Sequence, residues 1–214
     1  MRDPQTPNPI VTKGTRFWNR FAKRYAARPI QDTAAYEALL ADVATRLRAT
    51  DHVLEIGCGT GGTAIRLAPL VASFRATDFS DQMVRIAQAK AAPDNLEFHV
   101  TTAQTALEDG PFDAICAFNV LHLVDDLPKL LREIYHALHP GGLLISKTWC
   151  FADLGRRPRA IFKVLKFIGL FPPATSLTEL RLRQLFEAAG FNITDRRVFG
   201  NHSQNPYFIA RKPI

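Results

Sequence analysis

The chain has 214 residues, of which 47% are hydrophobic, 10% aromatic and 22% charged. This length fits one domain, and the composition supports a packed core and excludes an intrinsically disordered chain. The formal net charge of +7 permits an anionic partner, but no basic motif interleaved with aromatic residues is recognisable, so we expect no nucleic-acid partner.

The three cysteines, Cys58, Cys116 and Cys150, form no C-x-x-C pair, which predicts neither a zinc site nor a disulfide framework and favours a reducing compartment. Cys116 belongs to an apolar run and is expected in the core. No apolar segment reaches the length of a membrane span, and the charged, proline-bearing start lacks the apolar region of a signal peptide. We therefore expect a cytoplasmic protein without a bound metal.

Residues 1–50 are expected to form an N-terminal helical segment. The first dozen residues carry three prolines and are typical of an irregular tail. Aromatic and basic residues then alternate at helical spacing over 15–27, and Asp32 is placed to cap a second helix.

Residues 51–214 show a different pattern, in which short apolar strands alternate with amphipathic helices. The predicted strands are 52–57, 74–79, 95–102, 112–118 and 141–149, and the predicted helices are 62–70, 82–91 and 127–138. Strict alternation of this kind predicts a parallel sheet with helices on both faces.

The end of the chain departs from this alternation. After a helix over 178–189, stopped by Gly190, two strands follow at 191–199 and 207–211 with only a short loop between them. Such a link is too short for a parallel crossover, so the final pair is predicted to be antiparallel. Five parallel strands closed by an antiparallel hairpin differ from the usual dinucleotide-binding topology.

The sequence VLEIGCGTGG, Val53 to Gly62, places four glycines among six positions at the end of the first strand. It fits both G-x-G-x-x-G and E-x-G-x-G-x-G. Glycines at such a place let backbone N–H groups approach a ligand closely, whereas a ligand-free tight turn would need only one. The loop alone leaves open a nicotinamide cofactor or another adenosyl cofactor.

Asp78 ends the second strand, nineteen residues after Gly59, where a carboxylate can accept both hydroxyl protons of an adenosine ribose. The alternative is a helix-capping acid, a role for which Ser80 competes. A ribose-binding Asp78 disfavours a 2′-phosphate but does not identify the cofactor.

Four blocks, VLEIGCGTGG, ATDFS, FDAICAFNVLHLV and LHPGGLLISKT, resemble in order and spacing the class I S-adenosylmethionine-dependent methyltransferases. The resemblance covers roughly residues 53–212 and is strongest to the broad group of quinone-biosynthesis and small-molecule methyltransferases. It implies a Rossmann-like three-layer α/β sandwich, with a seven-stranded, mostly parallel sheet ending in an antiparallel hairpin. It also implies S-adenosyl-L-methionine as the cofactor.

The resemblance further implies individual roles at the cofactor. The glycine loop should contact the methionine part, Asp78 the ribose and the residues after the second and third strands the adenine. The cofactor-binding candidates are Glu55, which would order the loop, Gly57, Cys58, Gly59, Gly61, Asp78, Phe79, Met83, Ala103, Gln104 and Asn119. Gln104 stands where many members carry a carboxylate, so that contact would use an amide oxygen.

Methyl transfer needs alignment of the acceptor and, for some acceptors, removal of a proton. His122 is the candidate base; the alternative is a histidine that hydrogen-bonds within its loop. The resemblance implies that the N-terminal segment 1–50 covers the active site. Trp18 and Tyr25 either shield the methyl group and contact the acceptor or simply form the apolar face of a packed helix. Trp149 is a further candidate for the acceptor site, and His202 is a weaker one.

A segment at about 154–175 follows the fifth strand, where the resembling family builds covers over the acceptor pocket. It carries an apolar stripe, with bases on the opposite side: the stripe is Ile161, Val164, Leu165 and Ile168, and the bases are Arg159, Lys163 and Lys166. Two interpretations remain open: a lid over the active site, or a peripheral membrane contact through 156–171.

The leading hypothesis is a methyltransferase for a small apolar or amphipathic acceptor. One alternative is a membrane-surface methyltransferase that acts on a phospholipid or a quinone-like lipid. The others are an NAD-dependent oxidoreductase and a non-catalytic cofactor-binding module. The sequence assigns neither the acceptor nor the oligomeric state.

Overall fold

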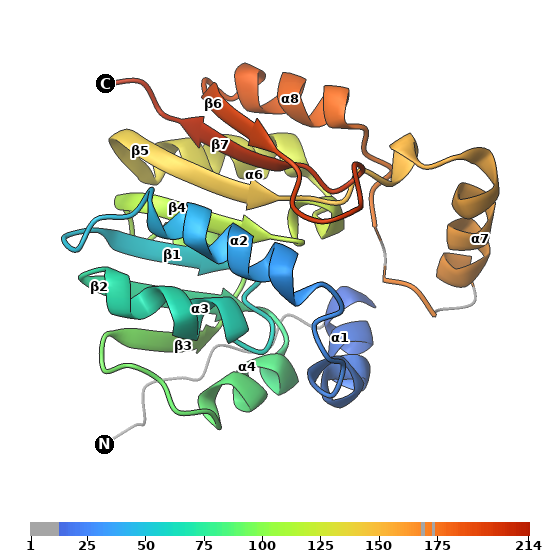
Figure 1. The fold of residues 1–214 in the computed structure, drawn as a ribbon, viewed down its shortest axis with the longest axis horizontal. Helices are drawn as coiled ribbons and strands as arrows, with labels where there is room; N and C mark the ends of the chain where they lie inside the picture. The colour runs from blue at the N-terminus through green and yellow to red at the C-terminus, as the bar shows by residue number, and fades with distance from the viewer. Residues whose placement is uncertain (1–12, 168–169, 173) are drawn as a thin grey trace.

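Seven strands form one sheet in the computed structural model, which describes residues 13–167, 170–172 and 174–214 (Figure 1). The strands are β1 (His52–Ile56), β2 (Ser73–Asp78), β3 (Leu96–Val100), β4 (Phe112–Phe118), β5 (Leu138–Lys147), β6 (Asn192–Arg197) and β7 (Tyr207–Arg211). Their order in the sheet is β3-β2-β1-β4-β5-β7-β6. β1 to β5 are parallel, and β7 runs antiparallel to both β5 and β6, which confirms the predicted hairpin.

The helices are α1 (Lys13–Ala26), α2 (Thr33–Ala44), α3 (Gly62–Leu67), α4 (Asp81–Gln88), α5 (Ala103–Leu107), α6 (Leu127–His136), α7 (Arg156–Phe167) and α8 (Glu179–Ala188). Short 3-10 turns occur at η1 (Ala68–Leu70), η2 (Leu121–Leu123) and η3 (Phe151–Asp153). The predicted tail at 1–12 lies outside the described residues. Within the described ranges, none of the helices is both long and apolar enough to cross a bilayer.

Side-chain oxygens cap several helices where the sequence placed them. Asp32 accepts a hydrogen bond from the backbone N–H of Ala35, as predicted. Ser80 accepts one from the N–H of Met83 and thereby caps α4. Since Ser80 takes the capping role, the carboxylate of Asp78 is left to face the neighbouring loop.

The core has two halves, one on each face of the sheet, because the central strands are apolar on both sides. Alternation along β7 illustrates this: Phe208 and Ala210 join one half, whereas Tyr207 and Ile209 join the other. α5, α6 and α8 cover the first face, and α2 and α3 cover the second (Figure 1). Cys116 of β4 is fully buried, as predicted.

The two edge strands carry charged side chains. On β3, Glu97 and His99 are exposed, and Glu97 Oε2 lies 3.0 Å from His99 Nε2. On β6, Arg196 pairs with Glu179 of α8 at 2.7 Å, and Arg197 binds Asp195 of the same strand and Asp42 of α2. The ion pair between Arg197 and Asp42 also joins the N-terminal segment to the β6–β7 hairpin.

Candidate active site

The glycine loop lies at the carboxyl end of β1, in the middle of the sheet. Its backbone passes through left-handed conformations at Gly57 (φ 69°), Gly59 (φ 55°) and Gly61 (φ 75°), which side chains other than glycine rarely adopt. A Cβ at Gly57 would lie 2.5 Å from Val120 Cγ2, whereas a Cβ at Gly59 would meet only Tyr25 Cε1, at 3.9 Å. Gly57 therefore permits close packing inside the protein, and Gly59 keeps the side of the loop near Tyr25 open.

Asp78, at the end of β2, binds the loop directly. Its Oδ2 accepts a hydrogen bond from Gly59 N at 3.0 Å, and its Oδ1 accepts one from Ser80 N at 2.8 Å. Burial raises the pKa of this carboxyl, although the two backbone hydrogen bonds oppose the rise. The same carboxylate thus positions the loop and borders the space in front of it.

Glu55 lies beneath the loop on β1 and is only 2% exposed. Burial, followed by the nearby charge of Asp78, raises its pKa to about 8. Its Oε2 is buried and has no hydrogen-bond partner among the described residues. Glu55 is therefore mostly protonated at neutral pH, and the carboxylate that borders the open space is that of Asp78.

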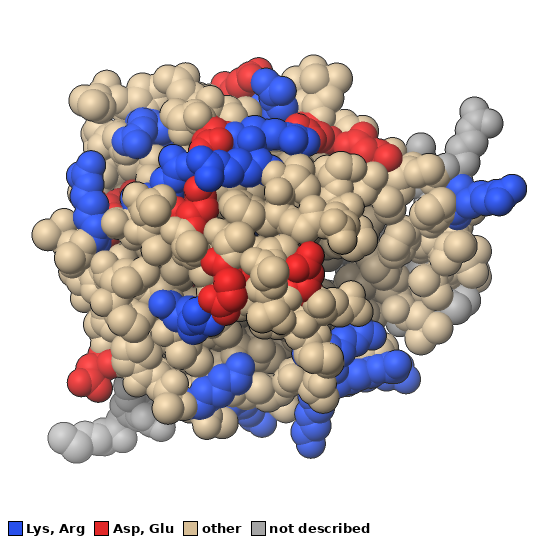
Figure 2. Space-filling model, in the orientation of Figure 1, with Lys and Arg blue, Asp and Glu red and all other residues tan. Residues whose placement is uncertain are grey.

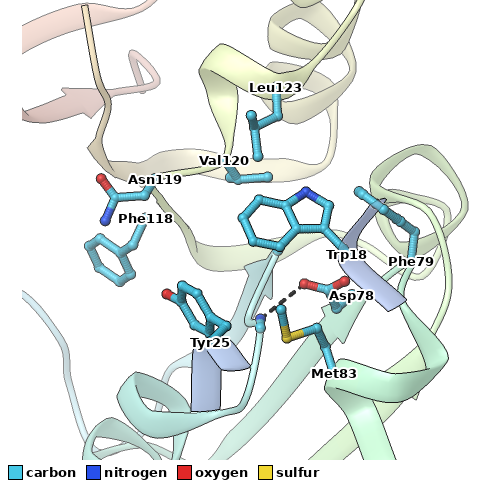
Figure 3. Close-up of a pocket in the computed structure, with 11 residues that line it drawn as sticks. Trp18, Tyr25, Asp78, Phe79, Met83, Phe118, Asn119, Val120 and Leu123 are labelled. Carbon is cyan, nitrogen blue, oxygen red and sulfur yellow. Dashed lines mark hydrogen bonds between the residues drawn. The ribbon is translucent and has the colours of Figure 1, made fainter. Parts of the chain in front are cut away.

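A narrow pocket with a cavity volume of about 60 Å³ opens in front of the loop (Figure 3). Its lining combines residues from α1, the loop after β1, β2, α4, the end of β4 and η2: Trp18, Tyr25, Gly57, Gly59, Asp78, Phe79, Met83, Phe118, Asn119, Val120 and Leu123. Figure 3 shows Trp18 across the middle of the pocket and Tyr25 beside Phe118. One carboxylate, an open backbone loop and apolar walls are a chemically suitable set for an adenosyl cofactor.

Eight of the residues singled out in the sequence therefore meet in one pocket. The other candidates lie elsewhere: Glu55, Cys58 and Gly61 are buried behind the lining, Ala103 and Gln104 begin α5, and His122 and Trp149 lie beyond the lining. Gln104 is exposed and Ala103 half-buried. Phe118, Val120 and Leu123 were not anticipated, since in the sequence they have the same apolar character as core residues.

Asn119 turns the chain at the end of β4. It is the only non-glycine residue with a positive φ (55°) in the described part of the chain, a conformation that asparagine tolerates better than most residues. Its N–H donates to Lys147 O at 2.6 Å, and its Oδ1 accepts from Asn205 Nδ2 at 3.3 Å. This turn directs Phe118 and Val120 toward the pocket.

His122 is only 5% exposed and does not line the pocket. Its ring packs against the edge of Phe151, with 5.3 Å between ring centroids. Burial lowers its pKa to about 4, so the imidazole is neutral at physiological pH. This environment disfavours a general base, and Nδ1 makes no hydrogen bond among the described residues, so the alternative of a loop hydrogen bond through Nδ1 is not seen there either.

An aromatic cluster adjoins His122 on the far side of η2. Phe151 is its centre, and Trp149 stacks on it at 5.7 Å and lies 5.2 Å from His202. Phe162 of α7 and Phe171 also pack on Phe151, at 5.1 and 5.4 Å. The cluster joins β5, the final hairpin and α7.

α7 contacts the aromatic cluster, and part of its apolar stripe is exposed. Phe162 contacts the aromatic cluster, whereas Ile161 and Val164 of the predicted stripe are each 59% exposed. The exposure of these two residues does not fit a lid whose stripe covers the active site, and it is compatible with the membrane-contact interpretation. Ile168 and the side chains of Arg159, Lys163 and Lys166 lie outside the described part of the chain.

Comparisons with known proteins agree with this geometry. A methyltransferase-domain family matches residues 54–146. The ubiquinone biosynthesis O-methyltransferase of Rhizobium etli (strain CIAT 652) is 31% identical over 173 residues, covering 75% of this chain and 68% of that protein. The demethylmenaquinone methyltransferase of Leptospira interrogans serovar copenhageni is 28% identical over 195 residues, covering 76% of this chain and 75% of that protein.

Among solved structures, the N-methyltransferase NodS from Bradyrhizobium japonicum WM9, in complex with S-adenosyl-L-homocysteine, has the same fold. The TM-score is 0.72 at 18% identity, covering 95% of this chain and 100% of that chain. Because both the R. etli protein and the matching family are methyltransferases, the glycine loop is assigned to the E-x-G-x-G-x-G template of an S-adenosylmethionine site. The alternative of an NAD-dependent oxidoreductase is therefore set aside. The chain belongs to the class I S-adenosylmethionine-dependent methyltransferases and uses S-adenosylmethionine as its cofactor.

Proposed function

We propose that this methyltransferase acts on a small apolar or amphipathic acceptor with a quinone-like or other planar ring. The observation that carries the proposal is the aromatic cluster around Phe151, which contacts His122, the residue next in sequence to Leu123 of the pocket wall. Planar rings stack on such surfaces and gain from their burial. The names of the relatives from R. etli and L. interrogans support the same acceptor class.

In this proposal the protein acts by alignment. S-adenosylmethionine, when bound, supplies a methyl group already activated by its sulfonium. Asp78 binds the ribose hydroxyls, the loop around Gly59 contacts the methionine part, and Trp18 and Tyr25 exclude water from the methyl group. Partial burial and the charge of Asp78 raise the pKa of Tyr25, so its phenol remains a neutral hydrogen-bond donor.

Alignment of this kind contributes about 7–11 kcal/mol in well-oriented intramolecular reactions and needs no covalent intermediate. His122 is neutral and buried, and its ring faces Phe151 rather than the pocket. Acceptors whose reacting group is already deprotonated, or acidic enough to lose its proton to water, should therefore react best.

A transfer assay with methyl-labelled S-adenosylmethionine tests the proposal. Hydroxylated quinone-like rings are compared with polar acceptors of similar size, such as amino acids and sugars. Preferential labelling of the ring compounds supports the proposal, and preferential labelling of polar acceptors contradicts it. Tight binding of S-adenosylhomocysteine without transfer to any acceptor would instead favour a non-catalytic cofactor-binding module.

A second candidate function, methyl transfer at a membrane surface, is favoured by one specific observation. Four apolar residues of α7 and the segment after it are exposed: Ile161 (59%), Val164 (59%), Phe167 (92%) and Leu170 (57%). α1 exposes the basic residues Arg16, Arg20, Lys23 and Arg24. It lies near the same end of the sheet as α7 (Figure 1), and Figure 2 shows Lys and Arg side chains gathered at the lower right, over α1. An anionic lipid surface would satisfy both groups and deliver a lipid or quinone-like acceptor.

Sedimentation with phosphatidylglycerol vesicles at low salt tests this second candidate. We expect the protein to pellet with the vesicles and Phe167→Ser to reduce the bound fraction. Leu180→Ser is the matched control, because Leu180 is also exposed (67%) but lies on α8. Wild-type protein that stays in the supernatant, or an equal loss in both variants, would rule out docking through α7.

A further inference from the structure

Asn19 connects α1 to the first turn of α4 through both ends of its amide. Its Nδ2 donates to Asp81 Oδ1 at 2.6 Å, and its Oδ1 accepts from Ser80 Oγ at 2.6 Å. The partners lie more than sixty positions away in sequence, so these contacts are tertiary and hold α1 in place. Both are short, and one is made to a carboxylate, which makes it stronger than a neutral hydrogen bond.

Ser80 places this contact next to the cofactor site. It is fully buried, it caps α4, and its N–H donates to the Oδ1 of Asp78 at 2.8 Å. The residue that orients Asp78 is therefore the residue to which Asn19 binds. The position of α1 and the geometry of the carboxylate of Asp78 therefore depend on one shared residue, which binds Asn19 through its hydroxyl and Asp78 through its backbone N–H.

α1 also supplies part of the pocket wall. Trp18, directly before Asn19, crosses the pocket, and Tyr25 lines it two turns further along (Figure 3). These two rings are themselves in edge contact, with 5.9 Å between their centroids. Movement of α1 away from α4 would take both rings out of the pocket and open it to solvent.

We infer that Asn19 is a positioning residue that fastens α1 over the bound cofactor and thereby slows cofactor exchange. Asn19 does not itself line the pocket. Its role is to keep Trp18 and Tyr25 in the closed position. The inference rests on the assigned cofactor and not on the acceptor proposed above.

The test measures the exchange of S-adenosylhomocysteine by surface plasmon resonance. Asn19→Ala removes both hydrogen bonds, and we expect the dissociation rate to rise about tenfold or more, with the association rate within about threefold of wild type. Gln82→Ala is the matched control, because Gln82 Nε2 also donates to Asp81, whose Oδ2 accepts at 3.0 Å, and this hydrogen bond lies within α4. Its rates should equal those of the wild type.

A second readout separates positioning from general stability. α1 contains four exposed Lys and Arg residues, so trypsin reports its opening. S-adenosylhomocysteine should protect α1 from cleavage in the wild type and in Gln82→Ala, but not in Asn19→Ala. If Asn19→Ala does not fold, Asn19→Asp replaces it: the new carboxylate still accepts from Ser80 but repels Asp81, and an intermediate rise in dissociation is expected.

A dissociation rate in Asn19→Ala within twofold of wild type, or an equal rise in Gln82→Ala, would overturn the inference. Either result leaves the acceptor proposal untouched, because neither measurement includes an acceptor. Conversely, the predicted exchange rates do not depend on whether the protein methylates ring compounds, so failure of that assay would not contradict this inference.

Discussion

Gly57 and Gly59 offer a matched pair of substitutions that separates packing from cofactor binding. Both residues have a left-handed backbone, with φ of 69° and 55°. An alanine at either position costs about 1–2 kcal/mol for that conformation alone. The two positions differ in what the added methyl group would meet.

At Gly57 the new Cβ would lie 2.5 Å from Val120 Cγ2 and 2.7 Å from Val120 Cβ, closer than real Cβ contacts allow. Overpacking of this kind costs a further 1–3 kcal/mol, roughly, so Gly57→Ala should lower the free energy of unfolding by about 2–5 kcal/mol. At Gly59 the nearest atom would be Tyr25 Cε1, at 3.9 Å, so only the backbone cost of about 1–2 kcal/mol applies. The methyl group would instead enter the space that the cofactor needs.

Urea denaturation and calorimetric titration with S-adenosylhomocysteine test this reasoning together. Gly57→Ala should show the larger loss of stability. Gly59→Ala should keep most of its stability and still lose at least about tenfold in affinity, the equivalent of 1.4 kcal/mol. Equal stability losses would refute the packing argument, and wild-type affinity in Gly59→Ala would refute the placement of the cofactor against the loop.

Three further predictions concern the ionisable groups. Asp78→Asn should fold but lose about 1.5–3 kcal/mol of cofactor binding, seen calorimetrically as a roughly 10- to 150-fold weaker affinity, because the charge-assisted bonds to the ribose are lost; unchanged affinity would contradict the ribose role. Because the Glu55 pKa is about 8 in the folded protein and 4.5 in the unfolded chain, the folded protein holds this proton more tightly. The resulting contribution to the free energy of unfolding is fully present below pH 4.5 and is lost as the pH rises through 8. The free energy of unfolding should therefore fall over this range, and Glu55→Gln should flatten that fall in urea titrations; a slope unchanged by the substitution would count against a buried, protonated Glu55. His122→Gln should retain the turnover rate within about threefold, whereas a loss of 10²-fold or more, typical of a general base, would restore His122 to that role.

The fold could be predicted from local patterns because each pattern had a physical cause within a few residues. Alternating apolar strands and amphipathic helices require a parallel sheet, and the short link before Tyr207 requires an antiparallel pair. The glycine loop and Asp78 could be located because both lie where strands of such a sheet end. Their hydrogen bond at 3.0 Å follows from that shared edge.

The other pocket walls could not be predicted because they depend on tertiary contacts. Val120 and Leu123 resemble core residues in the sequence, and only the left-handed turn at Asn119 directs them to the pocket. The burial of His122 depends on Phe151, which lies twenty-nine positions later and is itself held by α7. Helical periodicity alone could not decide which face of α7 packs against the protein.

The charged edges of the sheet have a consequence for self-association. Both edge strands carry charged residues where another strand would have to pair. These residues are Glu97 and His99 on β3, and Asp195, Arg196 and Arg197 on β6. Adding a strand at either edge would force these charges out of water or against their copies, a cost that discourages edge-to-edge polymerisation. Growth of the folded sheet by addition of a strand from another copy is therefore disfavoured at both of its edges.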